Sequence, residues 1–204
     1  MTKIDICNHA LLKIGASNIA SLDTDSNTDN ATIQSAKLCN IFFEQALEEV
    51  LRTYKWNSAL KRKKLSRLTE TPDFRFQYIY QLPNDYIRVI NIYDNKEGID
   101  NKIQFVVEGK QILCDHEEIY LSYVARVEDV NSLNAFATQC VIQNLAIKLS
   151  VPMQLDQDMQ NNLIKEYNEV ILPNAKSIDT QENRYWEMEE SDTLLSIYKT
   201  SPMI

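Results

Sequence analysis

The sequence of 204 residues contains only three glycines, and this scarcity excludes several classes of nucleotide-binding protein. Rossmann and Walker motifs need closely spaced glycines, because only a backbone without a Cβ atom can wrap so tightly around a phosphate. No run of about eighteen apolar residues occurs, so the sequence predicts no transmembrane helix. The start of the chain lacks a long apolar segment with a small-residue cleavage site. We therefore expect residues 2–14 to form a helix rather than a signal peptide, with Thr2 and Asp5 resembling a weak capping box at its start.

Residues that bind metals or act as nucleophiles are also few. Four cysteines are spread widely with no Cys-x-x-Cys pair, which indicates reduced thiols in a protein made in a cytoplasm. Cys114 and His116 are potential zinc ligands, but nothing nearby in the sequence completes a tetrahedral set. With two histidines and no serine or cysteine suitably placed beside them, the sequence indicates no catalytic triad. We predict no metal, no cofactor and no catalytic residue.

Adjacent carboxylates are the other candidates for catalysis. Glu48–Glu49 and Glu117–Glu118 could serve a glycosidase, which needs one carboxyl group with a raised pKa and one ordinary carboxylate. Adjacent glutamates on a helix more often point into water. The sequence therefore favours a protein that is not an enzyme.

Charge is distributed unevenly along a chain whose net charge is −8. Lys61, Arg62, Lys63 and Lys64 form a basic run, whereas residues 177–204 carry six acidic groups against two basic ones. The basic run could contact phosphate or pair with an acidic neighbour. Affinity for nucleic acid comes largely from neutralised phosphates, so an acidic chain is a poor tight binder of DNA. A further hypothesis is a regulatory module that binds nucleic acid. This hypothesis predicts that the isolated chain binds DNA and that the binding is sensitive to salt.

Hydrophobic periodicity places one long amphipathic helix from about Asp29, with Asp29 or Asn30 as a plausible N-cap. Phe43, Leu47 and Tyr54 recur at steps of three and four along it, and we predict that they belong to the structural core. Trp56 follows where the helix should turn into a sheet. We expect it to be a core residue as well.

The periodicity then changes, and this change predicts the fold class. Residues 61–130 alternate with a period of about two, which predicts a β subdomain, an antiparallel meander of about five strands. Helices return over residues 131–176 and should end near Pro173. The sequence therefore predicts an α+β, mainly helical fold. In it, residues 1–60 and 131–176 build a four-helix bundle with the small meander inserted.

Beyond this domain of residues 1–176, residues 177–204 show no sustained period and are predicted to form an extended C-terminal tail. Purely disordered tails are poor in large aromatic residues. This one keeps several large side chains that could act as docking anchors, namely Tyr185, Trp186, Met188, Leu195, Ile197 and Tyr198. We expect the tail to dock, either on its own domain or on a neighbour.

Five pieces of the sequence carry a family resemblance. They are residues 6–16 with 19–23 (ICNHALLKIGA and IASLD), Leu51-Arg52 with Trp56-Asn57-Ser58-Ala59, Lys63-Lys64-Leu65, residues 78–89 (YIYQLPNDYIRV), and residues 120–127 (YLSYVARV) with the helix that starts at Phe136. In this order they resemble the head-to-tail adaptor proteins of short-tailed bacteriophages (podoviruses), often called tail tubular protein A. The likeness covers about residues 1–176, and the tail matches nothing in the family.

The resemblance implies a structural virion protein of the head–tail junction, made in the bacterial host cytoplasm and without a catalytic centre. Such adaptors form a ring, commonly of twelve copies, between the portal protein above and the tail nozzle, a tail tubular B-like protein, below. Genomic DNA passes through the bore during ejection without specific binding, and no membrane is involved. Net negative charge fits this role, because a negative wall repels the phosphate backbone. The alternative is a tail accessory protein that hydrolyses peptidoglycan.

Overall fold

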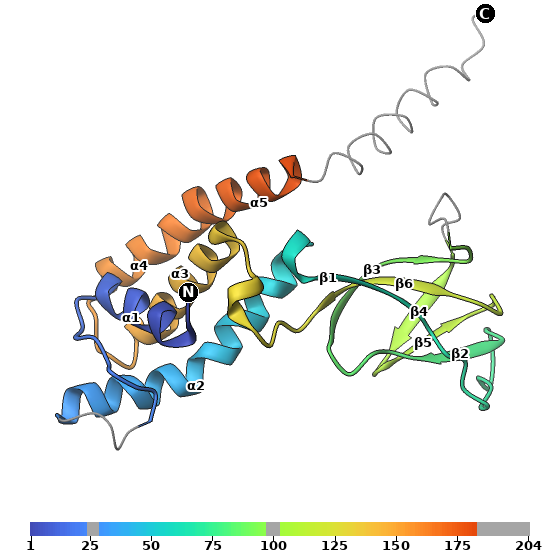
Figure 1. Cartoon of the computed structure of the whole chain (residues 1–204), viewed down its shortest axis with the longest axis horizontal. Helices are drawn as coiled ribbons and strands as arrows, with labels where there is room; N and C mark the ends of the chain where they lie inside the picture. The colour runs from blue at the N-terminus through green and yellow to red at the C-terminus, as the bar shows by residue number, and fades with distance from the viewer. Residues whose placement is uncertain (24–28, 97–102, 183–204) are drawn as a thin grey trace, which may run out of the picture.

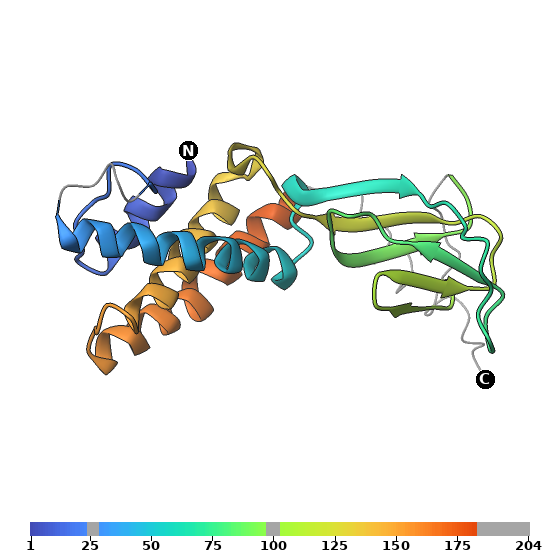
Figure 2. The same cartoon turned by 90° about the horizontal axis from the view of Figure 1, so that it is seen from below.

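The computed structural model describes residues 1–23, 29–96 and 103–182. Helices gather at one end of an elongated molecule and strands at the other, which we call the helical body and the β body (Figure 1). The segment of residues 54–59, between the second helix and the first strand, is the neck. A view from below shows the same separation, with the strands arranged in layers (Figure 2).

The first two helices begin at side-chain caps. Thr2 precedes α1 (Lys3–Lys13) and forms a capping box with Asp5, in which each side chain accepts a hydrogen bond from the other residue's backbone N–H. Asp29 precedes α2 (Asn30–Thr53) and accepts a bond from the Thr32 N–H at 2.8 Å. Both caps confirm predictions from the sequence.

Helix α3 (Ala135–Ser150) lies at the centre of the helical body. It contacts α1 and α2 and also the later helices α4 (Gln157–Glu166) and α5 (Leu172–Gln181). Eleven of its sixteen residues are buried, including Gln143 and Asn144. A helix that is apolar around most of its circumference is stable only when other helices surround it. The predicted four-helix bundle, with one apolar face for each helix, is therefore wrong. The other helices surround α3 instead.

A long C-terminal helix is assembled from three segments, α4 (Gln157–Glu166), a π-helical turn (Tyr167–Ile171) and α5 (Leu172–Gln181). Its inward positions recur every four residues, at Leu163, Tyr167, Ile171, Ala175 and Asp179. In a pure α-helix such a repeat would rotate away from α3 by about 40° per step. The wider π turn offsets this drift and keeps the positions on one side.

The sequence predicted that the last helix ends near Pro173, and this prediction is wrong. Pro173 stands in the first turn of α5, where a residue without an N–H is tolerated. The π turn just before it accommodates the change in hydrogen bonding. Residues 177–181, assigned to the tail from the sequence, are helical.

The strands form two separate antiparallel sheets. The first has the order β1-β6-β3, made of β1 (Leu60–Lys64), β6 (Tyr120–Ala125) and β3 (Tyr86–Tyr93). The second has the order β2-β5-β4, made of β2 (Tyr78–Gln81), β5 (Gln111–Cys114) and β4 (Phe105–Glu108). The predicted single meander of about five strands is thus wrong as well.

The reason for this error is that most strand partners are distant in the sequence. Leu60 lies opposite Val124, and Tyr78 lies opposite Cys114. Only β4 and β5 form a hairpin of consecutive strands, joined at Gly109, whose φ of +58° favours glycine. Alternating hydrophobicity identifies the buried face of a strand but does not identify its partner.

Each body has its own apolar core. The core of the helical body continues through the neck, because Trp56, Ile87 and Val124 belong to it. A second core lies between the two sheets and includes Tyr80 and Leu121. Short 3-10 turns, Asn57–Ala59 and Val130–Ser132, connect the bodies to each other.

Candidate interaction site

The neck is built on Trp56, which is fully buried. Its indole N–H donates a hydrogen bond to the backbone carbonyl of Val50 at 2.7 Å, so the polar atom of this buried ring has a partner. The Tyr54 ring packs edge-on against it, with the ring centroids 5.2 Å apart. Of the other residues predicted for the core, Phe43 and Leu47 are buried and Tyr54 is half-buried.

Asp179, Asn57 and Asn134 form a group that we call the neck latch. The buried carboxylate of Asp179 accepts bonds from the Asn57 backbone N–H at 3.1 and 3.3 Å and from the Asn134 side-chain amide at 2.8 Å. The Asn57 side-chain amide donates to the Asp179 backbone carbonyl at 2.6 Å. Beside the latch, the hydroxyl groups of Tyr54 and Thr180 share a further hydrogen bond. The latch therefore ties the end of α5 to the neck and to the start of α3.

The electrostatics of the latch are governed by the burial of the Asp179 carboxyl group. Burial raises the pKa of Asp179, and the bonds from Asn57 and Asn134 oppose this rise only in part. The sequence analysis did not identify Asp179. The four-residue repeat that runs through Pro173 and ends at Asp179 was the signal that could have found it.

Segments far apart in the sequence meet around the neck. Arg52 donates to the backbone carbonyl of Ile87 at 3.1 Å, and Arg88 donates back to the carbonyl of Arg52 at 3.1 Å. The Arg126 N–H donates to the Asp85 carbonyl at 2.6 Å. The end of α2, the turn before β3 and the end of β6 are therefore joined to one another, and all three belong to pieces that carry the family resemblance.

The basic run forms β1, an edge strand whose residues Lys61, Arg62, Lys63 and Lys64 are all exposed; we call these four the basic edge. Its two outer members are ion-paired, Lys61 with Asp85 at 2.7 Å and Lys64 with Glu118 at 2.8 Å. Arg62 and Lys63 form no ion pair within the described part of the chain. The edge thus keeps two cationic groups available to a partner.

Asp85 connects the basic edge to the neck. Burial raises the pKa of its carboxyl group, but hydrogen bonds from Lys61 and Tyr123 outweigh this effect and lower the pKa overall. Burial, together with the neighbouring Asp85, raises the pKa of Tyr123 to about 12. Both groups therefore keep one charge state at neutral pH, and they hold β1 and β6 against the turn before β3.

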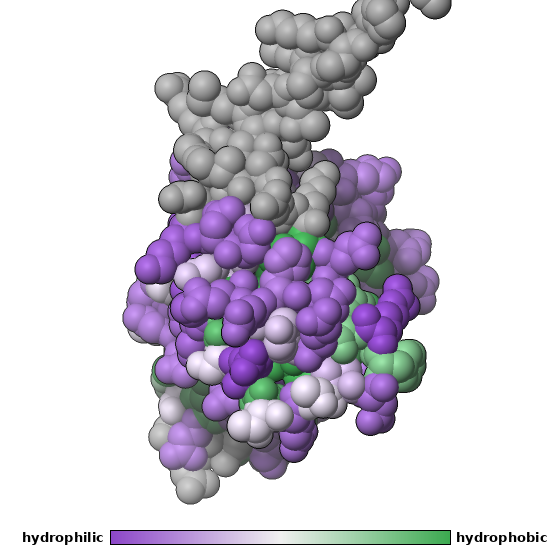
Figure 3. Space-filling view, turned by 90° about the vertical axis from the view of Figure 1, so that its right-hand side faces the viewer, coloured by the Kyte–Doolittle hydropathy of each residue, from purple (hydrophilic) through white to green (hydrophobic). Residues whose placement is uncertain are grey.

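A second exposed surface lies at the far end of the β body, in the loop of residues 66–77. Phe74 in this loop is 81% exposed, the largest fraction among the exposed apolar side chains of the described residues. The next residue, Arg75, has a φ of +74°, which a non-glycine residue rarely adopts. Figure 3 looks onto this end and shows a mostly hydrophilic surface with isolated hydrophobic side chains. A cavity of about 390 Å³ lies beside the loop, lined partly by Phe74, Ile79 and Leu113.

The carboxylate pairs considered for catalysis are engaged in ion pairs. Glu48 binds Arg52 at 2.9 Å, and Glu49 binds Lys148 at 2.7 Å. Glu118 binds Lys64, and Glu117 lies 3.7 Å from the guanidinium of Arg67. Asp179 has the raised pKa that a general acid needs, but it is 1% exposed and lies beneath its amide partners. The four glutamates are thus engaged in ion pairs near the surface, and the cavity that Glu48 lines is small, about 20 Å³.

Three further observations concern the described residues. No group of three histidine, cysteine, aspartate or glutamate residues among them could hold a metal ion. None of the helices formed by them is both long enough and apolar enough to cross a bilayer. The predicted docking residues, Tyr185, Trp186, Met188, Leu195, Ile197 and Tyr198, lie outside the described part of the chain.

Comparisons with known proteins add no family to this picture. No protein-family model matches the chain, and no curated protein matches its sequence significantly.

Proposed function

We propose that this chain is a structural protein of a short-tailed bacteriophage, a head-to-tail adaptor without enzymatic activity. Copies of it form a ring, twelve being the number common in the family that it resembles. The ring joins the portal protein to the tail nozzle protein at the head–tail junction of the virion. Genomic DNA passes through the channel that the ring lines.

The observation that carries this proposal is the neck. Three of the five pieces of sequence on which the resemblance rests include the end of α2, the start of β3 with the turn before it, and the end of β6, and backbone and side-chain bonds join these parts at the neck. Motifs that are separate in the sequence but meet at one junction are what a shared architecture requires. The resemblance therefore gains support from contacts that were not visible in the sequence.

The latch adds a reason why the junction suits assembly. It fixes Asp179, near the end of α5, to the neck, so the last described turn of the chain is held at the junction of the two bodies. Residues 183–204 contain the predicted docking anchors, of which Trp186 is the largest. Trp and Tyr dominate the energetics of many interfaces, so a segment with such anchors is suited to bind the portal or a neighbouring subunit.

Charge supports a channel lining more than a DNA-binding protein. The chain carries a net charge of −8, and half of the basic edge is neutralised by Asp85 and Glu118. Repeated around a ring, this negative charge repels phosphate and favours sliding of the DNA over binding. We expect the isolated chain to show no DNA binding at physiological salt.

The test is the variant Trp186→Ala, measured in two ways. We expect it to lower ring assembly or attachment to the portal and to leave the thermal stability of the monomer nearly unchanged. A loss of about 3 kcal/mol or more, the usual result of removing a core aromatic ring, would place Trp186 in its own core and contradict the docking role. A turbidity assay on peptidoglycan checks the rival hydrolase. Clearing by the purified chain would overturn the proposal.

A further inference from the structure

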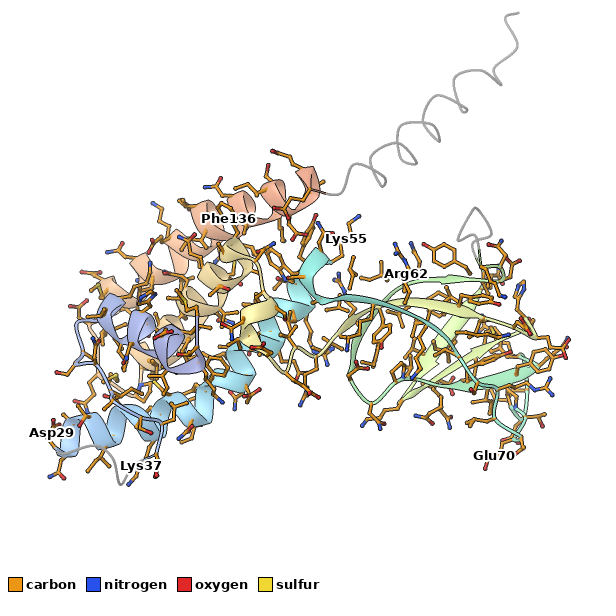
Figure 4. The ribbon with its side chains drawn as sticks, viewed as in Figure 1. Asp29, Lys37, Lys55, Arg62, Glu70 and Phe136 are labelled. Atoms are coloured by element: carbon orange, nitrogen blue, oxygen red, sulfur yellow. The ribbon has the colours of Figure 1, made fainter. Side chains whose placement is uncertain are left out.

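The end of α5 lies close to the basic edge. Asp179 is bonded to Asn57, which lies three residues before the first residue of β1, and α5 ends at Gln181. In Figure 4, Arg62 lies on the side of the neck that also holds Lys55 and the end of α5. The last described turn of the chain, at the end of α5, is therefore held near one end of the exposed cationic strand.

The charges of the C-terminal segment, residues 183–204, complement those of the strand. Between Arg184 and Lys199 all of its charged side chains are acidic, namely Glu187, Glu189, Glu190 and Asp192. The basic edge presents four cationic side chains, two of which, Arg62 and Lys63, form no ion pair within the described residues. Opposite charges attract, so an acidic stretch of this composition is suited to contact exposed cationic side chains that are not already ion-paired.

The spacing allows the two to meet within a single chain. Glu187 follows Glu182 by five positions in the sequence, which allows a reach of up to about 17 Å. The five residues of β1 have a similar length of about 17 Å. A short tether also gives a high effective concentration, which favours contact within one chain over contact between two chains in dilute solution.

We propose that the basic edge is the docking surface for the acidic stretch of residues 187–192 of the same chain. Arg62 and Lys63 are the contact residues, and Lys61 and Lys64 flank them. In this resting arrangement the segment occupies an open sheet edge, which would otherwise be free to pair with another strand. The inference does not depend on the adaptor role, because it concerns the isolated chain alone.

Carbodiimide cross-linking of the purified full-length chain, followed by peptide mapping, tests the proposal. The reagent joins a lysine amine directly to a carboxylate that it contacts. We expect cross-links from Lys63 to residues 187–192. The ion pairs Lys3–Glu44 and Lys148–Glu49, at 2.8 and 2.7 Å, are internal standards that should cross-link in every sample.

Charge reversal supplies the matched comparison. Arg62→Glu/Lys63→Glu removes the reactive amine of Lys63, so this variant is read at the flanking Lys61 and Lys64, whose cross-links to the acidic stretch should fall from their wild-type level to background. The control Lys37→Glu/Lys110→Glu, which makes the same change of net charge at exposed positions away from the edge, should retain them. Adding Glu187→Lys and Glu189→Lys to the first variant should restore cross-links, now from these new lysines to the new glutamates on β1.

An equal mixture of chains labelled with ¹⁵N and unlabelled chains separates contact within a chain from contact between chains. We expect cross-linked peptides whose two halves carry the same label. The proposal is overturned if the internal standards cross-link but the acidic stretch does not. It is equally overturned if Arg62→Glu/Lys63→Glu leaves the cross-links unchanged, or if mixed-label products dominate. If the expected cross-links form but the chain binds no portal protein, the docking of residues 187–192 is supported and the adaptor role is contradicted.

Discussion

The neck and the loop at the far end of the β body use similar side chains in opposite ways. Trp56 in the neck is fully buried and donates its indole hydrogen bond, whereas Phe74 in the loop is 81% exposed. A buried aromatic ring with a satisfied polar atom stabilises the fold of its own chain. The exposed ring of Phe74, next to Arg75 with its unusual backbone geometry, gains little stabilisation from burial in its own chain. The contrast separates the surface that folds this molecule from one that is available to a partner.

The same contrast appears in the charged groups. Asp179 in the neck is buried and accepts hydrogen bonds from Asn57 and Asn134, whereas Arg62 and Lys63 on the basic edge are exposed. Loss of a buried acceptor leaves its donors unpaired inside the protein. When an exposed charged group is lost, the groups that it contacted can bind water instead. Substitutions in the neck should therefore act on stability, and substitutions at the edge and in the loop should act on contacts.

The largest expected effect is that of Trp56→Ala. It removes a fully buried ring together with its indole hydrogen bond to the Val50 carbonyl, so we expect the free energy of unfolding to fall by about 3–5 kcal/mol. Chemical denaturation of the full chain measures this change. A loss below about 1 kcal/mol would mean that the neck does not need its central ring.

Next in size is Asp179→Ala, for which we expect a loss of about 1–3 kcal/mol, because two amide donors lose their shared acceptor inside the protein. Asp158→Ala is a suitable control, since Asp158 is also a helical aspartate but is exposed. It should change the free energy of unfolding by less than about 0.5 kcal/mol. Equal losses in the two variants would contradict the role assigned to the latch.

The latch also predicts a dependence on pH. Because burial raises the pKa of Asp179 in the folded state, its protonated form is favoured there. The stability from this group is fully present below the unfolded pKa of about 3.9 and is lost as the pH rises through the folded value. The free energy of unfolding of wild type minus that of Asp179→Asn should therefore fall as the pH rises from about 4 toward neutral. If this difference in the free energy of unfolding stays constant or increases with pH, the pKa of Asp179 is not raised in the folded state.

The smallest effect on stability should come from Phe74→Ser. The ring is almost entirely exposed, so we expect the free energy of unfolding to change by less than about 0.5 kcal/mol. Binding to the nozzle protein or to a neighbouring copy, measured by sedimentation, should weaken. Leu12→Ser, at an exposed site on α1 that is 57% accessible, is the matched control. If Phe74→Ser unfolds the chain, the loop belongs to its own core.

Particular elements show how far the sequence could predict this structure. The caps at Thr2 and Asp29 are local signals, and the sequence identified both. The pairing of β1 with β6 is not local, because residues about sixty positions apart become neighbours, and periodicity contains no information about such partners. The surrounded position of α3 was missed because its apolar residues were read as one broad face, although its circumference is largely buried.

The site shows the same limit. The basic run was visible in the sequence, but the ion pairs that neutralise Lys61 and Lys64 come from the turn before β3 and from the segment before β6. Asp179 was invisible because Pro173 was taken as a helix end. The π turn that lets the helix pass this proline depends on packing against α3 rather than on a local motif.

The central claim is tested most directly by native mass measurement of the purified chain, alone and mixed with a candidate portal ring. The account predicts that many copies add to each portal ring in one fixed number, whether the chain alone is a monomer or already a ring. A chain that stays monomeric and adds to no portal would contradict the adaptor role.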